Sequence, residues 1–285
     1  MKLLKGMEVV SFMNEAMKKE ISLLDYTPQL AIVRIGERPD DISYERGAVK
    51  RMETIGLGHQ LFSYPETITF EEFKKEFEKI NHNKEIDGIL LLRPLPKHIK
   101  EEEIATMISP EKDVDGISPM NMAKVFSGDH TGFAPCTPQA VIEMLHHANI
   151  SLVGKKVAIV GRSLVVGKPL AMLLVKEHAT VTICHTKTEE IEKECKQADI
   201  IIAAAGKAKM LTSEYVKDGA IVIDVGINVD ENNKLCGDVD FENVQDVVSI
   251  ITPVPGGVGT VTTSVLAKNV IQAAKKRREH IDEMR

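Results

Sequence analysis

The stretch Val157-Ala-Ile-Val-Gly161-Arg-Ser-Leu-Val-Val-Gly167-Lys-Pro-Leu-Ala-Met-Leu-Leu174 decides the fold class of this chain. Residues 157–160 are all apolar and end at a glycine, which is typical of a buried parallel strand that turns out of its sheet. Leu170, Leu173 and Leu174 then follow at helical spacing. We therefore predict that this stretch forms the first strand–turn–helix unit of a nucleotide-binding domain.

The turn after this strand has features of a phosphate-binding turn. Gly161 permits a tight turn, and Gly167 permits close approach to the helix start, where free backbone N–H groups favour an anion. The usual dinucleotide fingerprint has glycine at the position of Ser163, so the match is incomplete. A glycine turn without a ligand is the alternative interpretation.

The end of the next strand favours NADP over NAD. An NAD site normally has Asp or Glu here to bind the ribose hydroxyls, whereas this chain continues from Cys184 as His185-Thr186-Lys187-Thr188. Together with Arg162, these residues would attract a 2′-phosphate. For Lys187 alone, an ordinary polar turn residue is the alternative.

Length and composition indicate a soluble protein of two domains. A chain of 285 residues exceeds one typical core, and 43% hydrophobic with 27% charged residues is usual for globular proteins. The net charge of −6 argues against a nucleic-acid partner. The four cysteines lack zinc-site spacing and a disulfide framework, so we expect no metal and a cytoplasmic location. We expect no signal peptide and no membrane partner, because no apolar run is long enough.

The first half of the chain alternates strands and helices. This pattern predicts a parallel sheet covered by helices, with ligands at the carboxyl ends of the strands. The expected strands are 29–35, 60–64 and 87–92, and the expected helices are 5–24, 42–55 and 70–80. Asp40 and Asp41 can cap the second of these helices.

The loop Asp113-Val-Asp115-Gly116 puts two carboxylates on a tight turn. One of them can hydrogen-bond a donor-rich heterocycle such as an aminopyrimidinone. A purely structural Asx turn is the alternative.

The second half predicts further strands with glycine at their ends, such as Asp224-Val-Gly226-Ile-Asn228 and the segment 253–262. Thr263 or Ser264 can cap a last helix, and we expect the basic residues 275–278 near its end to be solvated rather than a binding patch. The expected strands are 157–160, 180–184, 199–205, 220–225 and 248–251, with a helix at 138–148.

With these motifs together, the chain resembles the methylenetetrahydrofolate dehydrogenase/cyclohydrolase (FolD-like) family over essentially its whole length. The resemblance is carried by Tyr44 twelve residues before Gly56, Gly88-Ile-Leu before Pro94-Leu-Pro96, Lys112-Asp-Val-Asp-Gly116, Pro135-Cys-Thr-Pro138, Gly161-Arg-Ser163 with Val166-Gly167, Cys184-His-Thr-Lys-Thr188, Asp224-Val-Gly-Ile-Asn228 and Pro253-Val-Pro-Gly-Gly-Val-Gly259.

The resemblance implies an α/β protein with two lobes and a cleft between them. Residues 1–138 with 264–285 would form a three-layer folate-binding catalytic domain. Residues 139–263 would form a Rossmann-type, doubly wound parallel-sheet domain for NADP. It also implies a homodimer, formed through the Rossmann lobes, in one-carbon metabolism.

The resemblance also assigns residues to the site. Tyr44 and Asp115 would be catalytic, and the substrate, a tetrahydrofolate, would contact Tyr44, Asp115, Pro255, Gly256 and Gly257. The cofactor would contact Gly161, Arg162, Ser163, Val166, Gly167, Thr186 and Ile227.

Two positions depart from the family pattern. The family's cyclohydrolase step uses a lysine four residues after the tyrosine and a glutamine two residues before Pro-Leu-Pro, but this chain has Ala48 and Leu92 there. Position 48 lies on the face of Tyr44, because four residues advance a helix by about 400°. Lys50 points about 200° away from Ala48 and cannot replace the lysine. Arg46, Arg51 and Arg93 are possible substitutes that can stabilise charge, but they are poor acids or bases.

The sequence therefore predicts an NADP-dependent methylenetetrahydrofolate dehydrogenase whose cyclohydrolase activity is weak or absent. Two alternatives stay open. One is a full bifunctional dehydrogenase/cyclohydrolase that uses a substitute residue. The other is a folate- and nucleotide-binding protein without catalysis.

Overall fold

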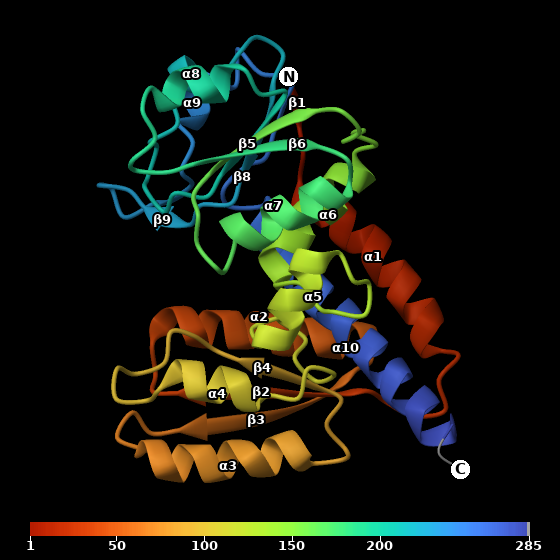
Figure 1. Ribbon diagram of the computed structural model, residues 1–285. Helices are drawn as coiled ribbons and strands as arrows, with labels where there is room; N and C mark the ends of the chain where they lie inside the picture. Colours follow the sequence, from red (N-terminus) through yellow and green to blue (C-terminus); the bar gives the residue numbers. More distant parts are fainter. Residues whose placement is uncertain (284–285) are drawn as a thin grey trace. The chain divides into compact units, whose positions relative to one another are not determined.

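The structure of the chain is a computed structural model that describes residues 1–283, with side chains up to residue 278 (Figure 1). It has two compact units. Unit 1 contains residues 1–12 and 137–262, and unit 2 contains residues 13–136 and 263–285. Two long helices, α1 (Gly6–Ile21) and α10 (Val258–Glu283), contribute residues to both units.

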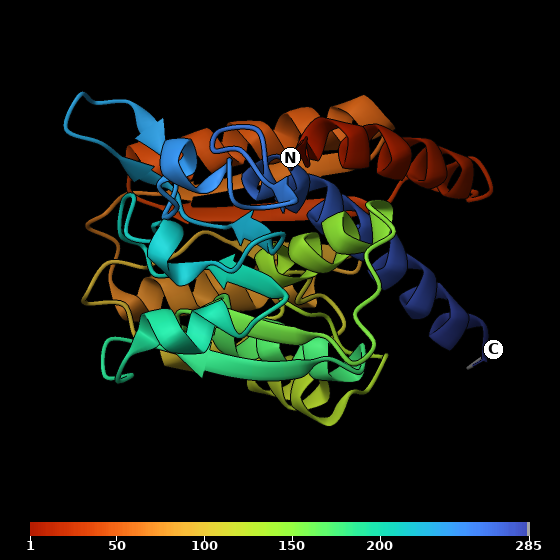
Figure 2. The same cartoon turned by 90° about the horizontal axis from the view of Figure 1, so that it is seen from above.

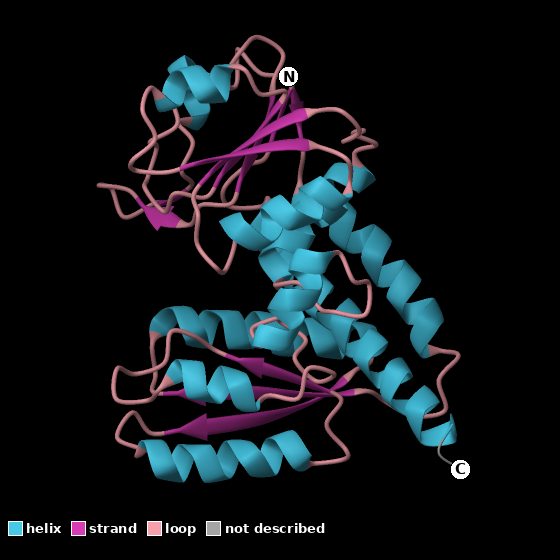
Figure 3. Ribbon diagram, in the orientation of Figure 1, coloured by secondary structure: helices cyan, strands magenta, loops and turns pink. Residues whose placement is uncertain are grey.

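Unit 2 contains a parallel three-stranded sheet with the order β3-β2-β4 (Figure 3). β2 (Gln29–Ile35) is central and pairs Gln29 with Gly58 at one edge and Leu30 with Gly88 at the other. The flanking strands are β3 (Gly58–Tyr64) and β4 (Gly88–Leu91). The helices of this unit are α2 (Pro39–Ile55), α3 (Phe70–His82), α4 (Glu101–Met107) and α5 (Pro119–Ser127).

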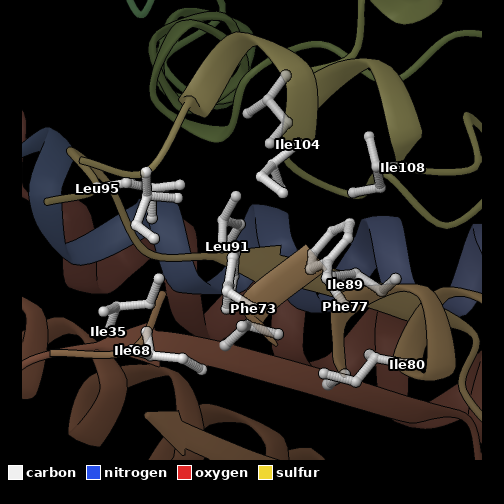
Figure 4. Close-up of a cluster of buried hydrophobic side chains, with 14 of the residues drawn as sticks. Ile35, Ile68, Phe73, Phe77, Ile80, Ile89, Leu91, Leu95, Ile104 and Ile108 are labelled. Carbon is white, nitrogen blue, oxygen red and sulfur yellow. The ribbon is translucent and has the colours of Figure 1, made fainter. Parts of the chain in front are cut away.

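One face of this sheet packs against α3 and α4 (Figure 4). Alternate residues of β2, such as Val33, point to the same face and meet Phe73 and Phe77 of α3 and Ile104 of α4, all fully buried. Burial of each such side chain stabilises the fold by roughly 1.5–3 kcal/mol. A capping box between Thr69 and Glu72 fixes the start of α3. This packing holds the carboxyl ends of the strands in place.

Unit 1 contains a parallel six-stranded sheet with the order β1-β11-β8-β7-β5-β6. Its strands are β1 (Lys2–Leu3), β5 (Lys156–Val160), β6 (Thr180–Cys184), β7 (Ile200–Ala203), β8 (Ile221–Asp224) and β11 (Ile250–Ile251). The order reverses direction at β5, as in a doubly wound nucleotide-binding fold. The expected α/β fold with a Rossmann-type parallel sheet is therefore confirmed.

The remaining elements of unit 1 are short. Its helices are α6 (Cys136–His147), α7 (Gly167–Lys176), α8 (Ile191–Lys196) and α9 (Phe241–Val244), with a 3-10 turn at Ser213–Tyr215. A hairpin of β9 (Asn228–Val229) and β10 (Leu235–Cys236) extends away from the large sheet, light blue in both views (Figures 1 and 2). Sequence patterns did not predict this hairpin, α4 or α5, because each is too short to show a clear period.

The N-terminal residues differ from the expected domain division. Lys2 and Leu3 form β1 and pair in parallel with Ile250 and Ile251 of β11. Residues 1–12 are consequently part of unit 1, whereas the sequence expectation put them in the folate-binding domain. A strand of two residues is too short to give a sequence signal.

Two expected helix starts were wrong. α10 begins at Val258, so Thr263 and Ser264 lie inside it and cannot cap it. Buried Val258 and Val261 extend the apolar helical pattern upstream of the expected start. α2 begins at Pro39, whose fixed φ suits the first helical position, and its N-cap Arg38 makes no side-chain cap.

The basic residues near the end of α10 are not simply solvated. Lys275 forms an ion pair with Glu20 of α1 at 2.6 Å, and Arg277 forms one with Asp87 at 2.9 Å. Arg278 lies 3.8 Å from the ring centre of Tyr26. These contacts hold the C-terminal part of α10 within unit 2. The expectation that these charges are solvated therefore holds only in part. Within the described chain, no helix has the length and apolar character needed to span a membrane.

Candidate functional site

The β5–α7 turn is closely packed around its two glycines. Gly161 has a φ of +138°, and a Cβ there would lie 2.1 Å from the carbonyl oxygen of Ala204. A Cβ at Gly167 would lie 2.1 Å from the carbonyl oxygen of Gly161. Both positions therefore require glycine for packing as well as for ligand approach.

The start of α7 is open to an anion. Its N-cap Val166 makes no side-chain cap, Lys168 N is bonded to Ser163 O and Pro169 has no N–H, so Gly167 N is the first-turn donor left for an anion. Ser163, which replaces the expected glycine, shapes the turn: its hydroxyl accepts from Val166 N at 3.0 Å, and its carbonyl accepts from Lys168 N at 3.0 Å. Arg162 and Ser163 are exposed beside this helix start. The arrangement fits a phosphate at the helix dipole.

The loop after β6 lies next to this turn, because Cys184 O accepts from Gly161 N at 2.9 Å. His185 N donates to Thr188 Oγ1 at 2.8 Å, and Lys187 N donates to His185 Nδ1 at 3.1 Å. Thr186 and Lys187 are exposed at the tip of the loop. Thr188 is thus a turn-forming residue, while Thr186, Lys187 and the nearby Arg162 are available to a 2′-phosphate.

The loop after β8 carries Ile227, which is 66% exposed between Gly226 and Asn228. Both neighbours contact the buried carboxylate of Asp238: Asn228 Nδ2 donates to it at 2.8 Å, and a Cβ at Gly226 would lie 2.3 Å from its Oδ1. Sequence reasoning missed Asp238. The repeated pairing of Asp with a nearby Gly, in Asp224-Val-Gly226 and Gly237-Asp238, is the signal that could have identified it.

The glycines of segment 253–257 pack against the start of α1. Gly256 has a φ of +100°, and its carbonyl oxygen accepts from Gly6 N at 2.8 Å. A Cβ at Gly257 would lie 2.4 Å from Pro253 O. Pro255, which follows a cis peptide bond, is exposed. The left-handed φ of Gly256 and the close packing at Gly257 therefore account for these two glycines, and their expected contact with substrate stays a prediction.

The two aspartates of the 113–116 loop have separate roles. Asp113 is fully buried and accepts from Ile117 N at 2.9 Å, Ser118 N at 2.8 Å and Asn121 Nδ2 at 2.9 Å. It is therefore the structural, turn-forming aspartate. Asp115 is half-buried, and its Oδ1 accepts a hydrogen bond from Cys136 N at 3.1 Å.

Burial is the largest electrostatic influence on Asp115. Desolvation raises the pKa of Asp115, the backbone hydrogen bond from Cys136 and the charge of Arg93 lower it, and nearby Asp113 raises it. A carboxyl with one oxygen satisfied and a raised pKa can bind donors of a polar ligand.

Tyr44 and Ala48 lie on the same face of α2, one turn apart. Tyr44 is half-buried, and Ala48 is completely buried. Leu92, directly after β4, is only 6% exposed. Ala48 and Leu92 are thus both buried apolar side chains.

The arginines considered as substitutes differ in their contacts. Arg51 follows Tyr44 by seven residues on the same face and donates to Thr263 Oγ1 at 3.4 Å and to Asn14 Oδ1 at 3.2 Å. Burial lowers the pKa of Arg51. Arg93 forms an ion pair with Glu101 at 3.4 Å. Arg46, like Lys50, is exposed.

Sequence-family models match the two parts of the chain. The catalytic domain of tetrahydrofolate dehydrogenase/cyclohydrolase matches residues 4–115, and its NAD(P)-binding domain matches residues 135–278. The "Bifunctional protein FolD" of Clostridioides difficile is 55% identical over 276 residues, which cover 96% of each chain.

Solved structures show the same relationship. The bifunctional FolD enzyme of Campylobacter jejuni has a TM-score of 0.94 at 40% identity and covers 97% of this chain and 99% of its own. The Trypanosoma brucei enzyme, described as a complex with NADP cofactor and inhibitor, has a TM-score of 0.91 at 32% identity and covers 96% of this chain and 97% of its own. On this likeness in sequence and fold, the chain belongs to the tetrahydrofolate dehydrogenase/cyclohydrolase family.

Proposed function

We propose that this protein oxidises methylene-tetrahydrofolate to methenyl-tetrahydrofolate with NADP, and that it hydrolyses the methenyl product weakly or not at all. Family membership supports the dehydrogenase reaction and a folate substrate. The proposal on hydrolysis rests on one observation: Ala48 and Leu92 are both apolar and buried.

The loss of both residues together is physically coherent. A buried lysine without its amide partner, or the reverse, would leave a polar group unsatisfied at a cost of roughly 1–3 kcal/mol. Two apolar residues avoid this cost. At these two positions, no side chain is left that can hold or move a proton.

The two reactions differ in their need for proton handling. Hydride transfer requires alignment of the reacting atoms and a dry site, since the lone pair of the folate nitrogen supplies the electrons. Hydrolysis requires water attack and ring opening, both with proton movement, and loss of a positioned acid or base typically slows such steps by about 10²–10⁴-fold. The dehydrogenase reaction is consequently the one that survives substitution at position 48.

NADP fits the residues of unit 1. The glycine-lined β5–α7 turn and the uncapped start of α7 fit a pyrophosphate, and Arg162 with Thr186 would bind the 2′-phosphate, since residues 185–188 directly after β6 include no acid. Bound NADP accepts the hydride. A charge-assisted contact should favour NADP over NAD by roughly 1.5–3 kcal/mol, which is about tenfold or more in affinity. Calorimetric titration that showed equal or tighter binding of NAD would contradict this assignment.

In unit 2, Asp115 would accept hydrogen bonds from the amino and amide donors of the pterin, and Tyr44 would lie over the substrate. Pro255, Gly256 and Gly257 stay proposed substrate contacts.

A second candidate, full bifunctionality, has two observations in its favour. Arg51 lies on the helical face of Tyr44 and Ala48, and burial lowers its pKa. Several relatives, including the one from Clostridioides difficile, carry the name of a bifunctional protein. An arginine can stabilise the charge that develops during water attack, but it exchanges protons poorly near neutral pH. We therefore favour the dehydrogenase with weak hydrolysis.

One assay separates the candidates. Protein, methylene-tetrahydrofolate and NADP are mixed, and absorbance is followed for the reduced cofactor and the methenyl product together. We expect the two to rise in parallel, and added methenyl-tetrahydrofolate to decay at the rate of buffer alone. Reduced cofactor without methenyl accumulation would favour the bifunctional enzyme, and no change in either signal would favour a binding protein.

The homodimer and the cytoplasmic location complete the proposal. Family resemblance motivates the dimer, and light scattering of the purified chain would measure it. A monomer mass at micromolar concentration would contradict it.

A further inference from the structure

The buried carboxylate of Asp238 contacts the segment directly after β7. Its Oδ2 accepts from Ala205 N at 2.6 Å and Gly206 N at 2.9 Å, and its Oδ1 accepts from Lys207 N at 2.9 Å. Asp238 is only 1% exposed. Three successive backbone N–H groups that can form an anion site are thus used by the protein's own carboxylate.

The same carboxylate holds the loop after β8 from both sides of Ile227. Asn228 Nδ2 donates to Asp238 Oδ1 at 2.8 Å. Gly226 is so close that a Cβ would lie 2.3 Å from this oxygen. The position of the exposed Ile227 between them is therefore set by Asp238.

Asp224 in turn fixes the backbone of Asp238. Its carboxylate accepts from Asp238 N at 3.0 Å, Val239 N at 2.9 Å and Gly226 N at 2.9 Å. A Cβ at Gly237 would lie 1.9 Å from Asp224 Oδ2, so glycine is required there. Asp238 cannot shift without breaking these contacts.

Residues 205–207, which are hydrogen-bonded to Asp238, lie next to the β5–α7 turn. The carbonyl oxygen of Ala204, one residue before the segment held by Asp238, lies against Gly161. A movement of residues 205–207 would therefore reach the turn that fits the pyrophosphate.

We propose that Asp238 is a positioning residue for dinucleotide binding, which holds Ile227 and residues 205–207 in the arrangement that accepts the cofactor. This inference rests on the proposed NADP site.

The test is the substitution Asp238→Asn, with Asp230→Asn as matched control. The Asn side chain has one acceptor oxygen for four donors, whereas the carboxylate has two. Asp230 is in the β9–β10 hairpin, accepts from Asn232 N and Lys234 N, and contacts Lys209 rather than the proposed site. We expect the dissociation constant for NADPH, measured by fluorescence titration, to rise about tenfold in Asp238→Asn and less than about twofold in the control.

Kinetics separate positioning from general damage to the fold. We expect the KM for NADP to rise about tenfold in Asp238→Asn, with kcat and the KM for the folate within about threefold of wild type. Equal losses in all three parameters, or unchanged NADPH affinity in a folded variant, would overturn the proposal.

A double-mutant cycle tests whether Asp238 acts through Ile227. If it does, Asp238→Asn should weaken NADPH binding at least about threefold less in an Ile227→Ala background than in the wild-type background. If the effects of the two substitutions on NADPH binding are additive, Asp238 does not act through Ile227.

A variant that fails to fold and a wild type that fails to bind NADPH have different consequences. If Asp238→Asn does not fold, Asn228→Ala removes one contact of the same carboxylate and should weaken NADPH binding about threefold, and unchanged affinity there would refute the inference. If the wild type itself neither binds NADPH nor oxidises methylene-tetrahydrofolate, the proposed function fails instead.

Discussion

The two carboxylate pairs of this molecule, Asp224 with Asp238 in unit 1 and Asp113 with Asp115 in unit 2, are used in different ways. In unit 1 both carboxylates are buried, and surrounding donors occupy both. In unit 2 three donors surround the buried Asp113, whereas the half-buried Asp115 accepts from one backbone donor, Cys136 N. The number of backbone donors within reach therefore distinguishes a carboxylate that shapes a loop from one that can bind a ligand.

Removing Asp113 should have the largest effect. Asp113→Ala leaves Ile117 N, Ser118 N and Asn121 Nδ2 buried without this acceptor, and we expect the free energy of unfolding to fall by at least about 3 kcal/mol. Urea denaturation measures this. The exposed Asp129, which accepts from Thr131 N, is the control, and Asp129→Ala should change stability little. Similar stability of the two variants would break the comparison.

Removing Asp115 should change binding rather than stability. Asp115→Ala loses an acceptor for the pterin donors, so we expect folate to bind weaker by roughly 1.5–3 kcal/mol, or about 10–150-fold. NADP affinity should stay within about twofold, because the proposed cofactor residues lie in unit 1. Calorimetry with each ligand gives both values. A parallel loss of both affinities would assign Asp115 a structural role like that of Asp113.

The raised pKa of Asp224 makes the free energy of unfolding depend on pH. Burial raises its pKa to about 6, so the folded protein holds this proton more tightly than the unfolded chain does. Its contribution to stability is present below the ordinary pKa of 3.8 and is lost as pH rises through about 6. Relative to Asp224→Asn, the wild type should therefore gain about 2 kcal/mol of unfolding free energy between pH 7.5 and 4.5.

Urea denaturation of both proteins at the two pH values measures this difference. Each variant serves as its own reference for the titration of all other groups, because only Asp224 differs. A difference independent of pH would show that Asp224 stays ionised in this range, as a carboxylate with three backbone donors can.

Introducing a polar pair at the buried positions 48 and 92 should have the smallest effect. The double change Ala48→Lys with Leu92→Gln introduces the residues that the proposed function takes to be missing, and we expect methenyl-tetrahydrofolate hydrolysis at least about tenfold above wild type. Ala48→Lys alone, which lacks the amide that holds it, should restore less. Loss of methenyl absorbance measures the rate, and Lys50→Ala is the matched control on the exposed face of α2. Hydrolysis by the wild type well above the buffer rate would point to Arg51 or Arg93.

Long elements with a clear hydrophobic pattern were predicted well. β2 and β6 have the predicted bounds, 29–35 and 180–184, since continuous or alternating apolar residues between turn residues leave one interpretation. The helix expected at 70–80 ends at His82. Short elements such as β1 and the β9–β10 hairpin depend on pairing with distant strands, which no local pattern encodes.

The sequence by itself determined the α/β fold class, the glycine turn after β5, the absence of an acid after β6, and the identities Ala48 and Leu92. These are local properties, set by side-chain chemistry and spacing. Only the tertiary structure decided which carboxylates accept hydrogen bonds from several backbone N–H groups. Asp113 and Asp115 are two residues apart and similar in sequence, and Asp238 lies 31 to 33 residues from the N–H groups that it accepts. The partners of Asp238 and Asp115 come from distant segments, and even the nearby donors of Asp113 converge on it only when the loop folds, so the sequence left these roles open.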